Sequence, residues 1–551
     1  MEVIRAARRF PTRTAVSAAQ LNFSYGELLE MATALAGRVK VALLSAPPGG
    51  CDPATRAAQG EQTLPGSGAR AGARVGVMAQ PGAEYVAAMW SAWLSGSVAV
   101  PLALSHPPAE LSYVLRDAGI SVVLATEEFQ ALLGPLAAEA GAHLLQVATL
   151  QPAAVQPAAA VAGEAEQGEA ARGALIIYTS GTTGRPKGAL HTHGSLKAQI
   201  DSMVSAWEWA ASDRILHPLP LHHIHGIVNA LLCPHAVGAT VEFVPKFSPS
   251  GMWSRLRAGA GGQQPPVTVF MGVPTMYVRL LQAADSTPAG PEKEAAAAAA
   301  AALRLTVSGS AACPVPLMDA WERATGTRLL ERYGMTEVGM ALSNPFRGER
   351  RAGFVGLPLP GVRIKVVPES EAPAPAGTEE SVREEAGGPV EEGPGELRLA
   401  GPAMFAGYWG KPEATAACYD ADGFFLTGDT VVRQSGSWRI LGRTSVDIIK
   451  CGGYKLSALE IEAHLLEHPA IGESAVVGLA DEAYGQVVAA VLVGKERAPP
   501  PTLAELRVWA RDVMAPYKVP TKVTVLDALP RNAMGKVNKK ELAKLFDVAA
   551  A

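Results

Sequence analysis

Short runs rich in β-branched residues alternate along this chain with stretches that have helical spacing. The runs are RVGVMAQ, SVAVPLA, SVVLAT, ALIIYTS, ATVEFVP, VTVFMGV and LRLTVSG. This alternation predicts βα units with helices packed on mostly parallel sheets. The chain has 551 residues, too many for one ordinary hydrophobic core and enough for two or three domains. We therefore expect an α/β fold with more than one sheet.

The pattern changes after about residue 440. The sequence there predicts a helix in EIEAHLLEHP, strands in ESAVVGLA and VVAAVLVG, and a helix in LAELRVWARDVM. We expect a large multi-sheet N-terminal domain over residues 1–441, a hinge over 442–447, and a small, mobile α+β C-terminal domain over 448–551.

Segments rich in Ala, Gly, Pro or Glu interrupt the pattern at 45–73, 151–172, 284–302 and 368–395. Such compositions favour solvated loops, so we interpret all of these segments as surface insertions.

Composition excludes several classes of protein. Hydrophobic residues make up 48% and charged residues 18%, which is typical of a globular protein. The net charge is −4, so there is no basic footprint for nucleic acid. No apolar run approaches the ~20 residues that span a bilayer. The cysteines (Cys51, Cys233, Cys313, Cys418 and Cys451) form no metal-ligand spacing, which indicates reduced thiols inside the cell.

The N-terminal stretch MEVIRAARRFPTRTAVS is rich in arginine and has a single early acid. It resembles a transit peptide faintly, and it suits the first helix of the fold equally well. The expected location is therefore intracellular, with the mitochondrial matrix, the cytosol and a plastid left open.

The stretch YTSGTTGRPKG follows the predicted strand ALIIY. Its hydroxyl groups, bare glycine N–H groups and lysine suit a loop that closes over phosphate oxygens. It is not the common phosphate-loop pattern, because the Gly-Lys pair is reversed and a proline precedes the lysine. The candidate phosphate-binding residues are Thr179, Ser180, Gly181, Thr182, Thr183, Gly184, Arg185, Pro186 and Lys187.

This string resembles the phosphate loop of the adenylate-forming superfamily, which includes acyl-CoA synthetases, luciferases and peptide-synthetase adenylation domains. These enzymes activate a carboxylate with ATP and release pyrophosphate. Further signatures follow in the family's order. The string RYGMTE implies that Tyr333 lines the adenine pocket, that Thr336 contacts the α-phosphate and that Glu337 binds Mg²⁺. The string TGD implies that Asp429 holds the ribose. The string GR implies that Arg443 contacts ribose or phosphate.

The C-terminal string PRNAMGKVNKKEL resembles the family's element that carries a catalytic lysine, here Lys536. The implied role is electrostatic, because AMP transfer to a carboxylate brings two anions together and a cation offsets their repulsion. In the family the small domain then rotates and presents KCGGYKL for thioester formation. Gly452 and Gly453 would let the backbone approach the pantetheine arm of CoA. Ser445 or Val446 falls near the usual pivot position.

The histidines of HPLPLHHIHG raise a metal site as an alternative. Adjacent side chains diverge, however, and no cysteine or acid completes a ligand set. The resemblance instead places His223 at the wall of the acyl pocket, where it gates the carboxylate. The candidate catalytic residues are therefore Lys536, Glu337 and His223.

Longer strings, among them MGVPTMYVRLL, SGSAACP and GRTSVDIIKCGGYKLSALEIE, resemble the malonyl-CoA synthetase branch. That branch converts malonate, and often methylmalonate, to a CoA thioester. A dicarboxylate leaves a second charge in the pocket, and burying it unpaired is costly. Arg279 is the candidate partner for that charge, with Ser308 and Gly309 lining the pocket floor.

The predicted function is thus an ATP-dependent malonate–CoA ligase that uses Mg²⁺ with ATP, takes CoA as co-substrate and needs no redox cofactor. One alternative is a short- or medium-chain monocarboxylate–CoA ligase in which Arg279 points to solvent. Others are a non-catalytic nucleotide-binding scaffold and, more distantly, a light-emitting oxygenase.

Overall fold

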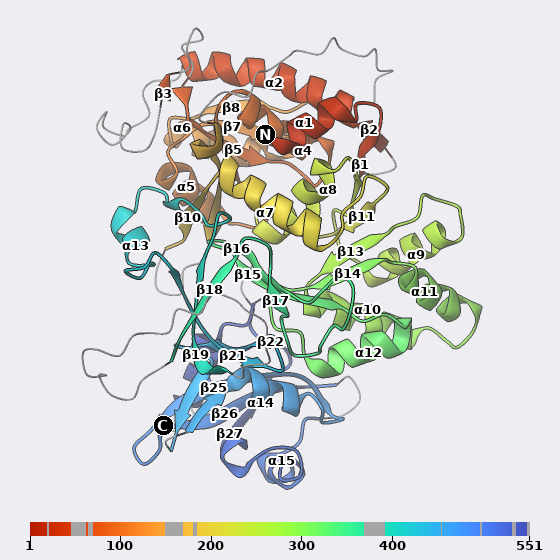
Figure 1. The fold of residues 1–551 in the computed structure, drawn as a ribbon, viewed down its shortest axis with the longest axis vertical. Helices are drawn as coiled ribbons and strands as arrows, with labels where there is room; N and C mark the ends of the chain where they lie inside the picture. Colours follow the sequence, from red (N-terminus) through yellow and green to blue (C-terminus); the bar gives the residue numbers. More distant parts are fainter. Residues whose placement is uncertain are drawn as a thin grey trace.

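The structure is a computed structural model. It describes residues 1–18, 21–45, 62–63, 70–148, 169–179, 185–368, 392–452, 454–495, 499–531 and 536–547. Counting only these residues, the strands form sheets of nine, seven, five and four strands and one two-stranded ribbon. This arrangement confirms the α/β class with several sheets in the large N-terminal part of the chain (Figure 1).

The seven-stranded sheet has a parallel centre, with the order β20-β10-β9-β6-β5-β7-β8. Its strands are β5 (Arg74–Met78), β6 (Val98–Pro101), β7 (Ile120–Ala125), β8 (His143–Gln146), β9 (Gly173–Thr179), β10 (Lys187–Thr192) and β20 (Gly407–Tyr408). The runs RVGVMAQ, SVAVPLA, SVVLAT and ALIIYTS therefore contain strands as predicted. Antiparallel pairing of β10 with β9 and β20 brings segments distant in sequence to one edge of the sheet.

The nine-stranded sheet has the order β17-β16-β15-β14-β13-β11-β12-β1-β2. Its strands are β1 (Thr14–Ala18), β2 (Leu21–Ser24), β11 (Arg214–His217), β12 (Thr240–Phe243), β13 (Val269–Gly272), β14 (Leu305–Ser308), β15 (Leu330–Met335), β16 (Gly339–Ser343) and β17 (Leu357–Pro358). From β1 to β15 neighbouring strands are parallel, so β11, β13, β14 and β15 end at the same edge. Ligands of open parallel sheets bind at that edge.

Helices cover these sheets, and the apolar faces that the sequence predicts lie inward. The helices are α1 (Glu2–Arg9), α2 (Tyr25–Ser45), α4 (Ala83–Leu94), α5 (Pro108–Asp117), α6 (Glu127–Glu139), α7 (His193–Ala206), a π-helix (His225–Leu232), α8 (Cys233–Ala236), α9 (Pro249–Ala260), α10 (Pro274–Ser286), α11 (Pro291–Ala301), α12 (Val315–Thr325) and α13 (Pro412–Ala416), with a 3-10 turn at Glu169–Ala171. No helix within the described ranges has the length and apolar character needed to cross a membrane.

The interpretation of 284–302 as a loop is wrong. Residues Pro291–Ala301 form α11, and three of its alanines, Ala296, Ala299 and Ala300, are buried. Alanine has the highest helix propensity, and proline suits the first helical position, so this run favours a helix. Of the other proposed insertions, a short ribbon of β3 (Gln62–Thr63) and β4 (Arg70–Ala71) is described within 45–73, and most of 151–172 and 368–395 lies outside the described residues.

The four-stranded sheet, in the order β18-β19-β21-β22, follows the nine-stranded sheet along the chain. Its strands are β18 (Arg363–Pro368), β19 (Glu392–Ala400), β21 (Phe425–Gln434) and β22 (Ser437–Arg443). Figure 1 shows these strands between the large N-terminal part of the molecule and the C-terminal elements drawn in blue.

The five-stranded sheet contains only residues from Ile448 onward. It consists of β23 (Ile448–Cys451), β24 (Tyr454–Ser457), β25 (Ile471–Asp481), β26 (Gly485–Gly494) and β27 (Lys522–Val525), with α14 (Ala458–Leu465), α15 (Leu503–Ala510), a 3-10 turn (Pro516–Lys518) and α16 (Lys539–Asp547). The predicted helices and strands of this smaller unit are present. The proposed hinge, 442–447, begins in the last two residues of β22 and ends directly before β23.

The described cysteines Cys233, Cys313, Cys418 and Cys451 are all free thiols, as predicted, and Cys51 lies outside the described residues.

Candidate active site

The predicted phosphate loop connects β9 to β10 at the edge of the seven-stranded sheet. Its ends are fixed: Thr179 pairs with Lys187 across the hairpin, and the Thr179 hydroxyl donates to the Lys187 carbonyl at 3.4 Å. The Pro186 carbonyl accepts a 2.8 Å hydrogen bond from the Tyr113 hydroxyl, and the Arg185 guanidinium lies over the Tyr113 ring. The rest of the predicted loop, Ser180, Gly181, Thr182, Thr183 and Gly184, lies outside the described residues.

Tyr408 joins the predicted phosphate lysine to the predicted magnesium ligand. The Lys187 ammonium lies 4.9 Å from the centroid of the Tyr408 ring, and the Tyr408 hydroxyl donates to Glu337 Oε1 at 2.8 Å. Glu337 is buried. Sequence analysis did not select Tyr408, because its place depends on the pairing of Tyr408 with Ala189 across β20 and β10. Lys187 and Glu337 therefore belong to one site.

Three further predicted residues meet at the four-stranded sheet. The Tyr333 hydroxyl donates to Asp429 Oδ2, and Arg443 Nε lies 3.0 Å from Asp429 Oδ1. Asp429 is opposite Arg443 in the β21–β22 register, which explains their contact. Burial raises the pKa of Asp429, while Arg443 and the Tyr333 hydrogen bond act against that rise. Each carboxylate oxygen keeps a second lone pair, so the ribose hydroxyls of a nucleotide can still donate to Asp429.

Thr336 is half-buried after β15, and its carbonyl accepts a 2.8 Å hydrogen bond from His191 Nε2. This contact fixes the turn after β15, which carries Thr336 and Glu337, against β10, so the RYGMTE segment faces the strand that follows the phosphate loop.

Lys536 comes from the C-terminal unit and reaches this site. The residue as a whole is exposed. Its ammonium group is nevertheless surrounded by protein atoms, and this desolvation lowers the pKa of Lys536. The neighbouring charge of Arg443 also lowers this pKa, and those of Asp429 and Glu337 raise it. The charge of Lys536 also acts on His223, whose pKa falls to about 4, chiefly through burial. His223 is therefore a neutral imidazole at neutral pH beside the predicted catalytic lysine.

The SGSA segment lies next to an arginine to which sequence analysis gave no role. A Cβ atom on Gly309 would come within 2.5 Å of Arg332 Cζ, so glycine is what lets this guanidinium approach. Arg332 Nη2 also lies 3.5 Å from the Ser310 hydroxyl. Ser310 has φ 68, a strained conformation for a residue with a side chain, and such strain clusters at functional sites. Ser308, fully buried below, has a hydroxyl with no hydrogen-bond partner.

The charge of Arg332 is buried, and few polar groups of the protein offset the cost of burying it. Its exposed fraction is 3%, and its Nε has no hydrogen-bond acceptor. Burial lowers its pKa to about 10. Within the described part of the chain, no carboxylate forms an ion pair with it. A buried cation of this kind is costly unless an anion is supplied. Arg279, by contrast, lies on the exposed side of α10 with its guanidinium over the Phe247 ring.

The histidine cluster offers no metal site among the residues that the structure describes, where no group of three or more His, Cys, Asp or Glu side chains could hold an ion. His217, at the end of β11, donates its Nε2–H to the Gly226 carbonyl and accepts the Leu219 N–H at Nδ1. The rings of His222 and His223 lie in a tilted contact with centroids 4.1 Å apart, and both have a buried Nε2 without a partner. Their partnerless nitrogens fit the wall of a ligand pocket better than a packed core.

The predicted CoA-binding loop is the turn between β23 and β24. Gly452 has φ 55 and donates its N–H to the Tyr484 carbonyl at 2.9 Å. Gly453 lies outside the described residues. The turn is exposed on the five-stranded sheet, and the residue that reaches the nucleotide residues from this unit is Lys536.

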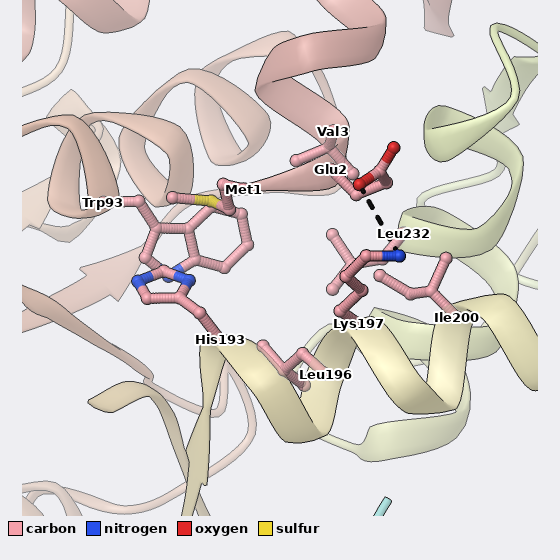
Figure 2. Close-up of a pocket in the computed structure, with 9 residues that line it drawn as sticks. All are labelled: Met1, Glu2, Val3, Trp93, His193, Leu196, Lys197, Ile200 and Leu232. Carbon is pink, nitrogen blue, oxygen red and sulfur yellow. Dashed lines mark ion pairs between the residues drawn. The ribbon is translucent and has the colours of Figure 1, made fainter. Parts of the chain in front are cut away.

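A separate small cavity lies between α1 and α7 (Figure 2). Its volume is about 20 Å³, room for a single water, and Met1, Trp93, His193 and Leu196 are among its lining side chains. None of its lining residues belongs to the site described above.

Comparison with known proteins identifies the family. Residues 54–409 match the model of the AMP-binding enzyme family, and residues 460–536 match that of the AMP-binding enzyme C-terminal domain. The chain belongs to the AMP-binding enzyme family.

Its relatives carry more specific names. A malonate–CoA ligase of Arabidopsis thaliana is 44% identical over 570 residues, which cover 99% of this chain and 89% of the relative. The mitochondrial malonate–CoA ligase ACSF3 of Homo sapiens is 47% identical over 481 residues, 86% of this chain and 83% of the relative. Among solved structures, ATP-bound MatB from Rhodopseudomonas palustris superposes with a TM-score of 0.78 at 31% identity and covers 100% of both chains.

Proposed function

We propose that this chain ligates malonate to CoA, with ATP cleaved to AMP and pyrophosphate through a malonyl-adenylate. The observation that supports malonate as the substrate is the environment of Arg332. Its guanidinium is buried, has no ion-pair partner among the described residues, and contacts Gly309 and Ser310. A dicarboxylate supplies the missing anion, and a guanidinium binds a carboxylate in bidentate fashion. The names of the Arabidopsis and human relatives support the same substrate.

In the first half-reaction one malonate carboxylate attacks the α-phosphorus of ATP. The new bond joins the carboxylate oxygen to phosphorus, and the bond to pyrophosphate breaks. Lys536 offsets the repulsion between the two anions, and Lys187 stabilises the phosphates. Asp429 and Tyr333 orient the ribose and the adenine, which places the α-phosphorus in line with its attacker.

Magnesium fits this site as an ion carried by the nucleotide. Glu337 offers one buried carboxylate whose Oε1 already accepts from Tyr408, which leaves Oε2 as a hard oxygen ligand. Mg²⁺ suits such a site, since it binds through one or two carboxylates together with substrate phosphates. When bound, it would neutralise phosphate charge during pyrophosphate departure.

In the second half-reaction the CoA thiol, having lost its proton, attacks the acyl carbon, and the bond to AMP breaks. The small unit would rotate about 442–447 to present the Gly452–Gly453 turn to the pantetheine arm. Glycine permits that close approach because it has no side chain.

The mitochondrial name of the human relative supports a mitochondrial location, which we propose in preference to the cytosol or a plastid. Imaging of a C-terminally tagged full-length chain in its own cells tests this choice.

The test of function is AMP formation by the purified chain with ATP, Mg²⁺ and CoA, across malonate, methylmalonate, succinate, acetate, butyrate and octanoate. We expect malonate to have the highest kcat/KM, by at least tenfold over the monocarboxylates, which equals about 1.4 kcal/mol of transition-state binding. The exposed position of Arg279 is what the monocarboxylate alternative requires, and a preference for butyrate or octanoate would establish that alternative. If none of these acids supports ATP–pyrophosphate exchange, the result favours the non-catalytic nucleotide-binding scaffold.

The contact geometry of Asp429 gives a second prediction. Asp429→Asn keeps the volume but removes the charge, so the hydrogen bonds from ribose hydroxyls weaken by about 1.5 kcal/mol. We expect the KM for ATP to rise about tenfold with little change in the KM for malonate. Asp422→Asn, an exposed carboxylate before the same strand, serves as the matched control. Equal rises in both KM values would contradict a ribose-specific role.

A further inference from the structure

The turn after β22, Arg443–Asp447, is closed by a carboxylate; we name it the hinge turn. Asp447 Oδ2 accepts the Arg443 N–H at 3.0 Å, and the Asp447 N–H donates to the Arg443 carbonyl at 2.7 Å. The turn is held to the nucleotide side, since the Thr444 N–H donates to the Gly428 carbonyl at 3.0 Å and the Arg443 side chain pairs with Asp429.

A lysine from α16 binds the other oxygen of the same carboxylate. Lys539 Nζ lies 2.5 Å from Asp447 Oδ1 and 2.7 Å from Glu462 Oε1. The exposed fractions of these side chains are only 11%, 12% and 15%. Burial acts to lower the pKa of Lys539, but Glu462 and Asp447 outweigh it and the pKa is raised. The ammonium therefore stays charged, and a buried ion pair of this kind is sensitive to the loss of either partner.

Lys539 lies three residues after Lys536, and the segment between them is held at both sides. Val537 forms a β-bridge with Arg531, and the Asn538 N–H donates to the Pro530 carbonyl at 3.2 Å. On the other side, the Lys539–Asp447 pair fixes the first turn of α16 to the hinge turn. A continuous set of contacts thus runs from the Lys536 segment through Asp447 and Arg443 to Asp429.

We propose that Lys539 is a positioning residue for adenylate formation, and that its ion pair with Asp447 fixes the Lys536 segment to the closed hinge turn so that Lys536 reaches the nucleotide. The inference rests on the proposed two-step ligase function. The second half-reaction does not use Lys536, because the proposed rotation of the small unit about 442–447 withdraws Lys536 from the nucleotide when it presents the Gly452–Gly453 turn. Loss of Lys539 should therefore affect the two half-reactions unequally.

The test compares the full chain with Lys539→Met, Lys539→Arg, Asp447→Asn and the double variant Lys539→Met/Asp447→Asn. Lys544→Met is the matched control, since Lys544 is an exposed lysine of the same helix, paired only with Glu541 in the contacts described. The first half-reaction is followed as ATP–pyrophosphate exchange, and the second as CoA-dependent consumption of enzyme-bound adenylate in a single turnover.

We expect Lys539→Met to lower the exchange rate tenfold or more while the single-turnover rate with CoA changes less than about threefold. Lys539→Arg should restore most of the exchange, because a guanidinium keeps the ion pair. The double variant should be no slower than Lys539→Met alone, since both changes remove one interaction.

Equal losses in both half-reactions, or additive losses in the double variant, would overturn the proposal and leave Lys539 a structural residue. Unchanged exchange in Lys539→Met would overturn it as well. Exchange is measured with malonate and with the acid that the wild type activates best in the panel above. A wild-type chain that activates another acid therefore refutes the malonate assignment without affecting the lysine test.

Discussion

Replacing Lys536 by methionine is expected to lower ATP–pyrophosphate exchange by about 10²–10³-fold, the usual loss when one preorganised group that stabilises transition-state charge is removed. The reason is the position of its ammonium, which interacts with the charges of Asp429 and Glu337 and with His223. Methionine keeps the length of the side chain and removes the charge. The measurement is exchange at saturating ATP and malonate, so that the loss appears in the rate.

Lys540→Met is the matched control for this variant, since Lys540 is an exposed lysine at the start of α16. It should retain exchange close to the wild-type rate. The single-turnover reaction of bound adenylate with CoA should also remain near normal in Lys536→Met. If that second step falls as far as the exchange, Lys536 acts through the fold of the C-terminal unit and not through charge in the first step.

Local patterns in the sequence predicted much of the fold, because each run of β-branched residues carries its own signal. Strands β5, β6, β7 and β9 lie where such runs occur. The error at Pro291–Ala301 arose because a run of alanines suits both a low-complexity loop and a helix. Burial against neighbouring helices favours the helix, and that packing is not visible in a single segment.

Short strings selected candidate residues that the fold brings close together. Tyr333 and Arg443 both contact Asp429. Lys187, Glu337, His223 and Lys536 lie around the same region, although they come from distant parts of the chain. Contacts set by strand register were missed. Tyr408 reaches Glu337 through the β10–β20 pairing, and Lys539 reaches Asp447 between segments that are far apart in sequence.

Arg332 was missed for the same physical reason. It directly precedes Tyr333 in the RYGMTE string, and a charged residue in the buried first half of β15 was a signal that the sequence interpretation left unused. The position of Arg332 beside the SGSA segment depends on the parallel register of β14 with β15. In that register Ser308 pairs with Glu331, so Gly309 lies beside Arg332. Arg279 was chosen instead because it flanks an apolar helix face, and that face packs as predicted while Arg279 itself is exposed.

Arg332→Met is expected to lower kcat/KM for malonate by about 10²–10³-fold, since truncating one partner of a buried, hydrogen-bonded charge pair costs about 2–5 kcal/mol. Butyrate has no distal charge, so its kcat/KM should not fall and the preference should invert. Arg332→Lys should recover only part of the malonate activity, because an ammonium lacks the bidentate geometry of a guanidinium. AMP formation with both acids measures each variant.

Arg279→Leu is the matched variant, and it separates the two candidate arginines. With its guanidinium over Phe247 on the exposed side of α10, Arg279 should be replaceable with little effect on malonate. Arg332→Met should also leave thermal stability unchanged or higher, because it removes a buried charge that has no ion-pair partner among the described residues. If Arg279→Leu abolishes malonate activation while Arg332→Met preserves it, Arg279 binds the distal carboxylate. In that case the buried charge of Arg332 serves the nucleotide phosphates, and the KM for ATP in Arg332→Met would rise in place of the KM for malonate.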